Sequence, residues 1–189
     1  MQHYNFQKRF KDVYNRALDA YRSGVRDADA LLDEADTAFL ASIGANAQHM
    51  FDYVEDALNG GEPDFETALM IEAVRRDYFL TIQKGVPSGN VLDASTLPGK
   101  EEAINGIVWL PRIMPKARAK LRGELPPSLM YCCGGDRNFF KTHDIHPAEF
   151  LRAVWAYEQD DEKLVAWVEA RSRATKAQSA SAAGSAPAG

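Results

Sequence analysis

Cysteine, histidine and long apolar runs are scarce in this sequence. The 189 residues include two cysteines, which are the adjacent pair Cys132 and Cys133, and four histidines. Adjacent cysteines rarely bridge each other, so we expect no disulfide framework. No apolar run approaches the roughly 18 to 20 residues of a membrane span, and the N-terminus lacks the apolar core of a secretory signal. These absences predict a cytoplasmic protein without a membrane segment.

Linear cofactor motifs are missing too. There is no nucleotide fingerprint, P-loop or catalytic triad motif, so no cofactor is expected. A net charge of -5 argues against nucleic acid as a partner, because phosphate binding needs a cationic excess on at least one face. The mixture of 46% hydrophobic and 26% charged residues is typical of a soluble globular protein.

Apolar residues recur at helical spacing, which predicts an all-α fold: a two-lobed helical bundle with a disordered C-terminal tail. We expect an N-terminal helical lobe at residues 1–89, a C-terminal helical domain at 90–171, and a tail at 172–189. The tail has too few apolar residues to offset the entropy cost of ordering it. Residues 86–99, with proline, glycine and little periodicity, read as the linker between lobes.

Individual helix ends can be predicted from capping residues. In the N-terminal lobe, Asp27 is a candidate N-cap for a second helix that stops or bends near Gly44, and Asp64 stands at the start of another. In the C-terminal domain we expect a helix over about residues 100–122, kinked or restarted at its two prolines, and a buried loop over 129–133. His146 and Asp160 mark the starts of two further helices.

The second half of the chain resembles a known family. The residues that carry the resemblance are Trp109-Leu-Pro-Arg followed by Lys116-Ala-Arg-Ala, then Asp136-Arg-Asn-Phe-Phe140 and Ile145-His-Pro-Ala-Glu-Phe150. They are similar to a family of small bacterial proteins known only as a domain of unknown function. The resemblance runs from about Val91 to Ala170, and it implies an all-helical domain without implying an activity.

A cluster of basic residues follows Trp109. Arg112, Lys116 and Lys120 are spaced at i, i+4 and i+8, which places them on one helical face. A guanidinium gives a carboxylate or phosphate paired hydrogen bonds, and an ammonium adds point charge. The alternative interpretation is a solvated helix face with ion pairs to the acidic first lobe. The candidate ligand-binding residues are Trp109, Arg112, Lys116, Arg118 and Arg137.

Three residues are candidates for catalysis. Cys132 becomes a nucleophile if His143 or Arg137 favours its thiolate, although a buried inert thiol is the commoner outcome. His49 shares a helical face with Asp52 and Tyr53, and Asp136 follows a glycine pair. The two cysteines with His143 and His146 are spaced poorly for zinc, so no metal site is predicted.

Two functions remain open from the sequence. The first is a small-molecule-binding protein or cofactor-independent enzyme that acts on an anionic carboxylate or phosphate ligand in the cleft between lobes. The alternative is a non-catalytic interaction or accessory protein that docks a partner through the basic helix from Trp109 to Arg122. Neither choice fixes whether the protein is an enzyme, or its oligomeric state.

Overall fold

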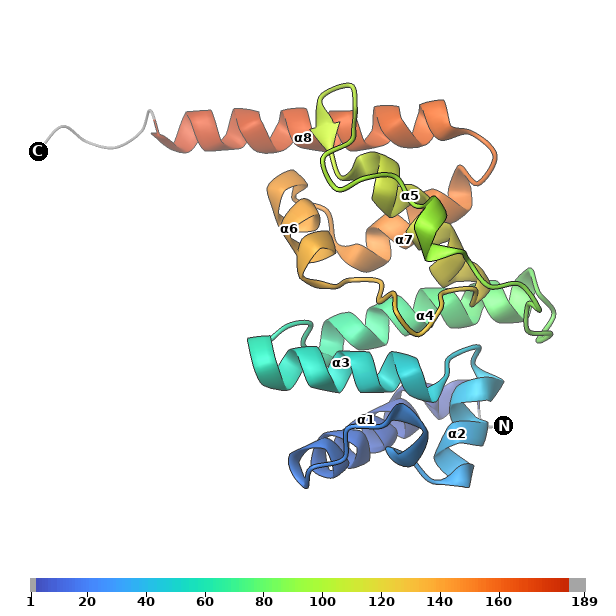
Figure 1. Ribbon diagram of the computed structural model, residues 1–189. Coiled ribbons are helices and arrows are strands. Elements are labelled where there is room, and N and C mark those ends of the chain that lie inside the picture. The colour runs from blue at the N-terminus through green and yellow to red at the C-terminus, as the bar shows by residue number, and fades with distance from the viewer. Residues whose placement is uncertain (1–2, 184–189) are drawn as a thin grey trace, which may run out of the picture.

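The computed structural model describes residues 3–183, with side chains described as far as residue 177. Within that part of the chain there are eight α-helices, three short 3-10 helices and one two-stranded hairpin, which confirms the all-α prediction (Figure 1). In chain order the elements are η1 His3–Asn5, α1 Phe6–Arg22, η2 Ala28–Ala30, α2 Glu34–Ser42, α3 Ala47–Gly60, α4 Phe65–Thr81, η3 Ala94–Thr96, β1 Ala103–Ile104, β2 Ile107–Val108, α5 Leu110–Arg122, α6 Gly134–His143, α7 Pro147–Ala156 and α8 Asp161–Ala183.

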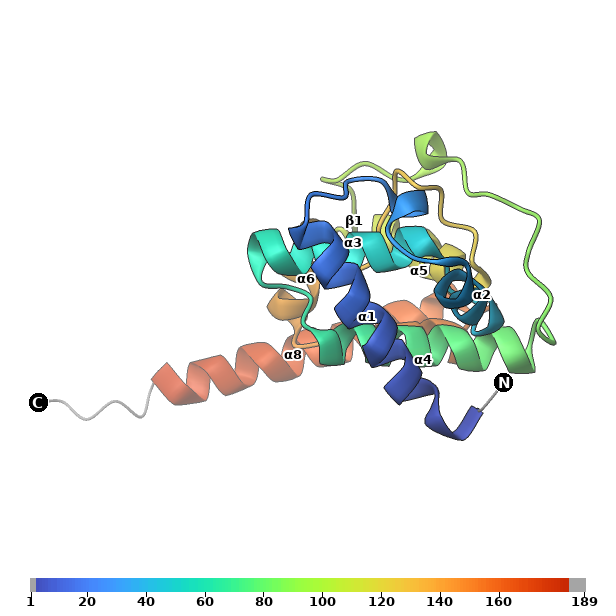
Figure 2. The ribbon, with the colours of Figure 1, turned by 90° about the horizontal axis from the view of Figure 1, so that it is seen from below.

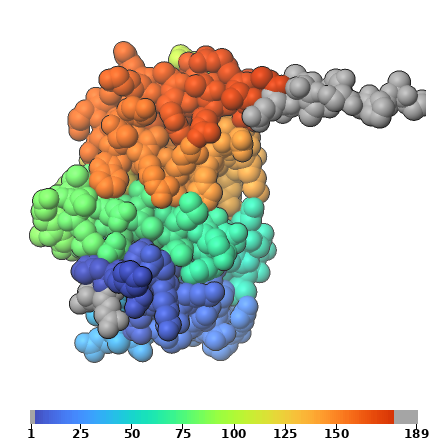
Figure 3. Space-filling model, turned by 180° about the vertical axis from the view of Figure 1, so that it is seen from behind, coloured from blue at the N-terminus to red at the C-terminus, as the bar shows by residue number. Residues whose placement is uncertain are grey.

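The helices stack in sequence order along the long direction of the molecule. Figure 1 shows α1 and α2 at one end, α3 and α4 in the middle and α5 to α8 at the other end, and Figure 3 shows the same order as successive bands of colour on the surface. Helix α4 joins the halves because it contacts α1 on one side and both α5 and α7 on the other. Buried apolar side chains from both halves form one continuous core.

The boundary predicted between residues 89 and 90 falls in the long loop between α4 and η3. Figure 2 shows this loop running along the side of the molecule. Its backbone is tied to the C-terminal half where the amide of Leu92 donates to the carbonyl of Glu124 at 2.7 Å. None of the helices in the described part of the chain is both long and apolar enough to cross a membrane.

Most of the predicted helix starts are confirmed. Asp64 caps α4 by accepting from the amide of Thr67, and His146 caps α7 by accepting from the amide of Ala148. Asp160 accepts from the amide of Lys163 at the start of α8. The prediction that Asp27 caps the second helix is wrong, because Asp27 caps only η2. Helix α2 is capped by Asp33, whose side chain accepts from the backbone amide of Asp36.

The helix expected over residues 100–122 is shorter than predicted. Residues 103–108 form the hairpin instead, with Asn105 and Gly106 both at positive φ in its turn. Asn-Gly is the dipeptide that favours this turn, so the sequence did carry the signal. Helix α5 begins at Leu110, and Pro111 lies in its first turn, where a missing amide proton costs no helical hydrogen bond.

Two further boundaries differ from prediction. Residues 134–143, for which no helix was predicted, form helix α6, which begins at the glycine pair. Helix α8 continues to Ala183, past the predicted end at Arg171, because alanine has high helix propensity and Ser172 is buried with its hydroxyl 2.5 Å from His143 Nδ1. The predicted tail therefore begins within a helix, and its last residues, 184–189, lie outside the described part of the chain.

Candidate functional site

A cleft of about 680 Å³ lies between the two halves of the molecule. One wall is α3, which contributes three carboxylates. The other walls are Trp109, the start of α5, the loop over residues 128–133 and the N-terminus of α6. Its charged lining residues are Asp52, Glu55, Asp56, Lys100, Arg112, Lys116 and Arg137. Four of the five predicted ligand-binding residues, all except Arg118, line this cleft.

A buried ion pair forms the floor of the cleft. The ammonium of Lys116 lies 2.7 Å from Asp136 Oδ2, and the two residues are 3% and 0% exposed. Asp136 is fully satisfied, since Oδ2 also accepts from the amide of Cys132 and Oδ1 accepts from Trp109 Nε1 at 3.0 Å. Asp136 thus orients the lysine and the indole and holds the loop, and it lies behind the cleft surface.

Trp109 is fixed by its neighbours as well as by that hydrogen bond. Its backbone has φ of 74°, an uncommon conformation for a bulky residue, and it stands immediately before α5. A Cβ built on Gly135 would lie 2.4 Å from the Trp109 ring, so only glycine leaves room for the indole there. The glycine pair therefore allows α6 to approach the aromatic wall of the cleft.

The arginines of the predicted set have different surroundings. Arg112 Nη1 donates to the carbonyl of Pro98 at 2.7 Å, and its guanidinium lies 5.9 Å from the Trp109 ring. Arg137 bridges the halves, with Nη1 2.7 Å from both Asp56 Oδ2 and the carbonyl of Cys132. Arg118 points elsewhere and pairs with Asp161, so the structure separates it from the others.

The adjacent cysteines have opposite environments. Cys132 is fully buried, and burial, with Asp136 nearby, raises the pKa of its thiol to about 12, so at neutral pH it is protonated and a poor nucleophile. Cys133 lines the cleft, with Sγ 3.2 Å from Lys116 Nζ. Sequence reasoning missed Cys133 because nothing in two adjacent cysteines shows which of them faces solvent.

His49, from α3, belongs to a second buried charge cluster. This cluster forms around Lys120, which lies one turn after Lys116 on α5. Lys120 Nζ lies 2.5 Å from Glu72 Oε1 and 3.1 Å from His49 Nδ1, and Tyr53 donates to the same carboxylate oxygen at 2.9 Å. Burial, with Lys120 nearby, lowers the pKa of His49, so the ring is neutral at pH 7 and Nδ1 accepts from the ammonium. Burial alone would raise the pKa of Glu72, but the Lys120 ammonium holds it below its ordinary value.

A small hollow next to the main cleft reaches this cluster. Its lining includes His49, Tyr53 and Lys120, and it shares Asp52 and the loop residues Leu129 and Met130 with the cleft. Of the three predicted catalytic residues, the structure thus places His49 and Asp136 at the two buried clusters under α5 and Cys132 in the core between them.

Asp52 and Glu55 are lining residues that the sequence did not single out as ligand-binding. Burial raises the pKa of Asp52 to about 6, against the opposing effect of a hydrogen bond from Gln48. Glu55 accepts from the hydroxyl of Tyr21 at 3.1 Å. Their helical spacing was visible in the sequence, but the identity of the opposite wall depends on how the halves pack.

The basic stretch from Trp109 to Arg122 is not a free cationic surface. Its five cations each have a protein partner: Arg112 with Pro98, Lys116 with Asp136, Arg118 with Asp161, Lys120 with Glu72, and Arg122 with Glu124. Lys116 and Lys120 are buried, so the alternative interpretation of the basic face as a solvated helix face is wrong for these two residues.

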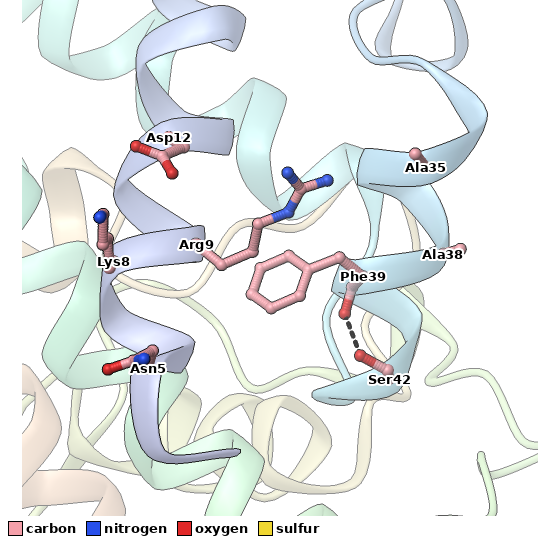
Figure 4. Close-up of a pocket in the computed structure, with 8 residues that line it drawn as sticks. All are labelled: Asn5, Lys8, Arg9, Asp12, Ala35, Ala38, Phe39 and Ser42. Carbon is pink, nitrogen blue, oxygen red and sulfur yellow. Dashed lines mark hydrogen bonds between the residues drawn. The ribbon is translucent and has the colours of Figure 1, made fainter. Parts of the chain in front are cut away.

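Another hollow, of about 620 Å³, lies between α1 and α2 (Figure 4). Arg9 from α1 lies across it, 5.7 Å from the Phe39 ring, and its guanidinium is paired with Asp36 at 2.7 Å. The other charged residues that line this hollow, Lys8 and Asp12, carry charges opposite to each other. This hollow therefore lacks the convergent polar groups of the main cleft. Within the described residues, no three histidine, cysteine or acidic side chains are grouped to hold a metal ion.

One comparison with known proteins gives a match to part of the chain. Residues 95–183 match the model of a family described as Domain of unknown function (DUF5069). No curated protein and no solved structure gives a significant match to the chain. The resemblance to an uncharacterised domain family is therefore confirmed, while a bacterial origin and the diagnostic value of the Trp-Leu-Pro-Arg motif stay predictions.

The matched DUF5069 segment covers one side of the cleft. It includes Lys100, Trp109, Arg112, Lys116, Cys133, Asp136 and Arg137. The carboxylates of α3 lie outside it, in the N-terminal half. The cleft is thus built where the matched segment meets a part of the chain that the family model does not reach.

Proposed function

We propose that the protein binds a small molecule carrying a carboxylate or phosphate group in the cleft between its halves. The observation that carries this proposal is the convergence of Arg112, Lys116 and Arg137 on one cleft beside the N-terminus of α6. Arg112 and Arg137 are 25 residues apart in the sequence and lie on different helices. Their convergence is therefore a product of folding.

The hydrogen-bonding capacity of the cations supports this proposal. A guanidinium has five N–H donors, and Arg112 uses one of them on Pro98. An ammonium has three donors, and Lys116 directs its protons to Asp136 and the Cys133 sulfur, which leaves one for a ligand. Because Asp136 already holds the lysine in place, an anion would meet a preorganised donor.

The N-terminus of α6 adds an electrostatic field that favours an anion in the cleft. Its N-cap residue, Cys133, makes no side-chain hydrogen bond to the first turn, and Cys133, Gly134 and Gly135 all line the cleft. The first amides of a helix have no intrahelical acceptors and carry partial positive charge, which favours an anion in front of them. In this arrangement Trp109 provides an apolar surface for the rest of the ligand.

A reaction on the bound anion would need more than the cations that bind it. Cys133 is a thiol that lines the cleft, 3.2 Å from Lys116 Nζ, and a cofactor-independent reaction on the bound anion would use it as a nucleophile, with neutral His49 in the adjoining hollow. We place ligand binding first because it needs only the cations and the helix terminus. Partner docking through the basic stretch has less support, since Lys116 and Lys120 are buried and Arg118 and Arg122 are paired with carboxylates of the chain.

Calorimetric titration with inorganic phosphate and with simple mono- and dicarboxylates tests the proposal. We expect Arg112→Ala to weaken binding of the best of these anions by about 1 to 3 kcal/mol, the range for hydrogen bonds to charged groups, with little change in melting temperature. Arg118→Ala is the matched control, since it removes a guanidinium from the same helix outside the cleft. Equal effects of the two variants, or no anion binding by the unmodified protein, would overturn the proposal.

A further inference from the structure

The carboxylate wall of the cleft carries information about the ligand that the cations do not. Asp52 and Glu55 are three residues apart on α3, and both line the cleft opposite Arg112. A ligand that was only anionic would bring its charge toward two carboxylates, and that repulsion would work against binding. The wall therefore restricts which anions fit.

These two carboxylates differ from the other acidic residues of the region in lacking a cation. Asp136 has Lys116, Glu72 has Lys120 and Asp56 has Arg137, each within 2.7 Å. Within the described residues, no lysine, arginine or histidine forms an ion pair with Asp52 or Glu55. Their polar partners are the neutral groups of Gln48 and Tyr21.

The opposite wall shows the converse. Among the described residues neither Arg112 nor Lys100 is ion-paired with a carboxylate, although both line the cleft. One cleft thus presents carboxylates without an ion pair on one side and cations without an ion pair on the other. A metal ion is not the natural occupant, because the described residues offer no group of three metal-ligating side chains.

We infer that the ligand is amphoteric, with a cationic amine held by Asp52 and Glu55 and an anionic group held by Arg112 and Lys116. This inference rests on the proposed anion-binding function and specifies its ligand class as amino acids or amino phosphates. The amine supplies the ion-pair partner that Asp52 lacks, and the anionic group accepts hydrogen bonds from the remaining N–H donors of the Arg112 guanidinium. Trp109 contacts the carbon chain between them.

Matched pairs of small molecules separate this inference from simple anion binding. Glycine, β-alanine, 4-aminobutanoate and 6-aminohexanoate are titrated against the intact chain beside acetate, propanoate, butanoate and hexanoate, and 2-aminoethyl phosphate beside ethyl phosphate. We expect at least one amino compound to bind about tenfold or more tightly than its partner without the amine. The chain length of that compound reports the spacing of the two walls.

Asp52→Asn provides the second arm. It keeps the side-chain shape and removes the charge, so we expect it to abolish the preference for the amino compound while binding of the partner without the amine is unchanged or tighter. Asp19→Asn is the control, because Asp19 is an exposed carboxylate on α1 paired with Arg22.

Each result decides something. Equal affinity within every pair would overturn the amphoteric ligand and leave the anion-binding function standing. A preference for the amino compound that persists in Asp52→Asn would overturn the assignment of Asp52 to the amine. Absence of binding by every compound would overturn the anion-binding function together with this inference.

Discussion

Lys116 and Lys120 lie one turn apart on α5, and both ammonium groups are buried against a carboxylate from another helix. Lys116 meets Asp136 from α6 at 2.7 Å, and Lys120 meets Glu72 from α4 at 2.5 Å. The basic face of α5 is therefore a pair of internal anchors: Lys120 joins α5 to α4 in the N-terminal half, and Lys116 joins α5 to α6 within the C-terminal half. The cleft lies over the first anchor.

The deeper anchor makes a stability prediction. Lys120→Met leaves Glu72 as an uncompensated buried charge, so we expect a loss of about 3 to 5 kcal/mol in the free energy of unfolding, measured by urea denaturation. The double variant Lys120→Met with Glu72→Gln removes both charges and should recover much of that loss. If the double variant loses as much as the sum of the two single variants, the pair is not coupled.

Asp52 makes a pH prediction. Because burial raises its pKa to about 6, the folded protein binds this proton more tightly than the unfolded chain does. This residue's contribution to stability is therefore most favourable below its ordinary pKa and declines as the pH rises to about 6. Asp52→Asn, which cannot ionise, should gain melting temperature relative to the unmodified protein between pH 4 and pH 7, by about 2 to 4 °C for each kcal/mol.

The control for that experiment is Asp19→Asn, whose difference from the unmodified protein should change little over the same pH range, because Asp19 is exposed. A gain for Asp52→Asn that is larger at pH 4 than at pH 7 would have the opposite sign, and would show that the folded protein favours the ionised carboxylate.

The two cysteines should differ in alkylation. Iodoacetamide added to the native protein at neutral pH should modify Cys133, which lines the cleft, and leave Cys132, which is 0% exposed. Mass spectrometry of peptides locates the label, and unfolding in urea should expose both thiols. Native labelling that persists in Cys133→Ser and is lost in Cys132→Ser would contradict the assignment of Cys132 to the core.

The glycine pair offers a matched test of the aromatic wall. A methyl group at Gly135 would lie 2.4 Å from the Trp109 ring, whereas the nearest atom to a methyl at Gly134 is a guanidinium nitrogen of Arg137 at 3.8 Å. We expect Gly135→Ala to lose about 1 to 3 kcal/mol of stability through overpacking and to change the tryptophan fluorescence. Gly134→Ala should be within about 1 kcal/mol of the unmodified protein. Similar effects of both substitutions would rule out the Trp109 contact as the cause.

The sequence by itself determined the local structure. Asp64, His146 and Asp160 could be recognised as helix starts because capping depends on a side chain and the amides two or three residues later. The helical spacing of Arg112, Lys116 and Lys120 was likewise readable, since it depends only on the repeat of an α-helix. The hairpin at Asn105 and Gly106 belongs to the same class, although its turn signal was overlooked in a pattern that looked helical.

The tertiary structure alone decided what those residues do. Nothing within α5 shows that Lys116 and Lys120 are buried, because their burial depends on Asp136 and Glu72 arriving from other helices to neutralise them. Which cysteine faces the cleft depends on the path of the loop before α6. The carboxylate wall faces the cations only because α4 joins α3's half of the molecule to α5, and no local pattern encodes such a contact between distant segments.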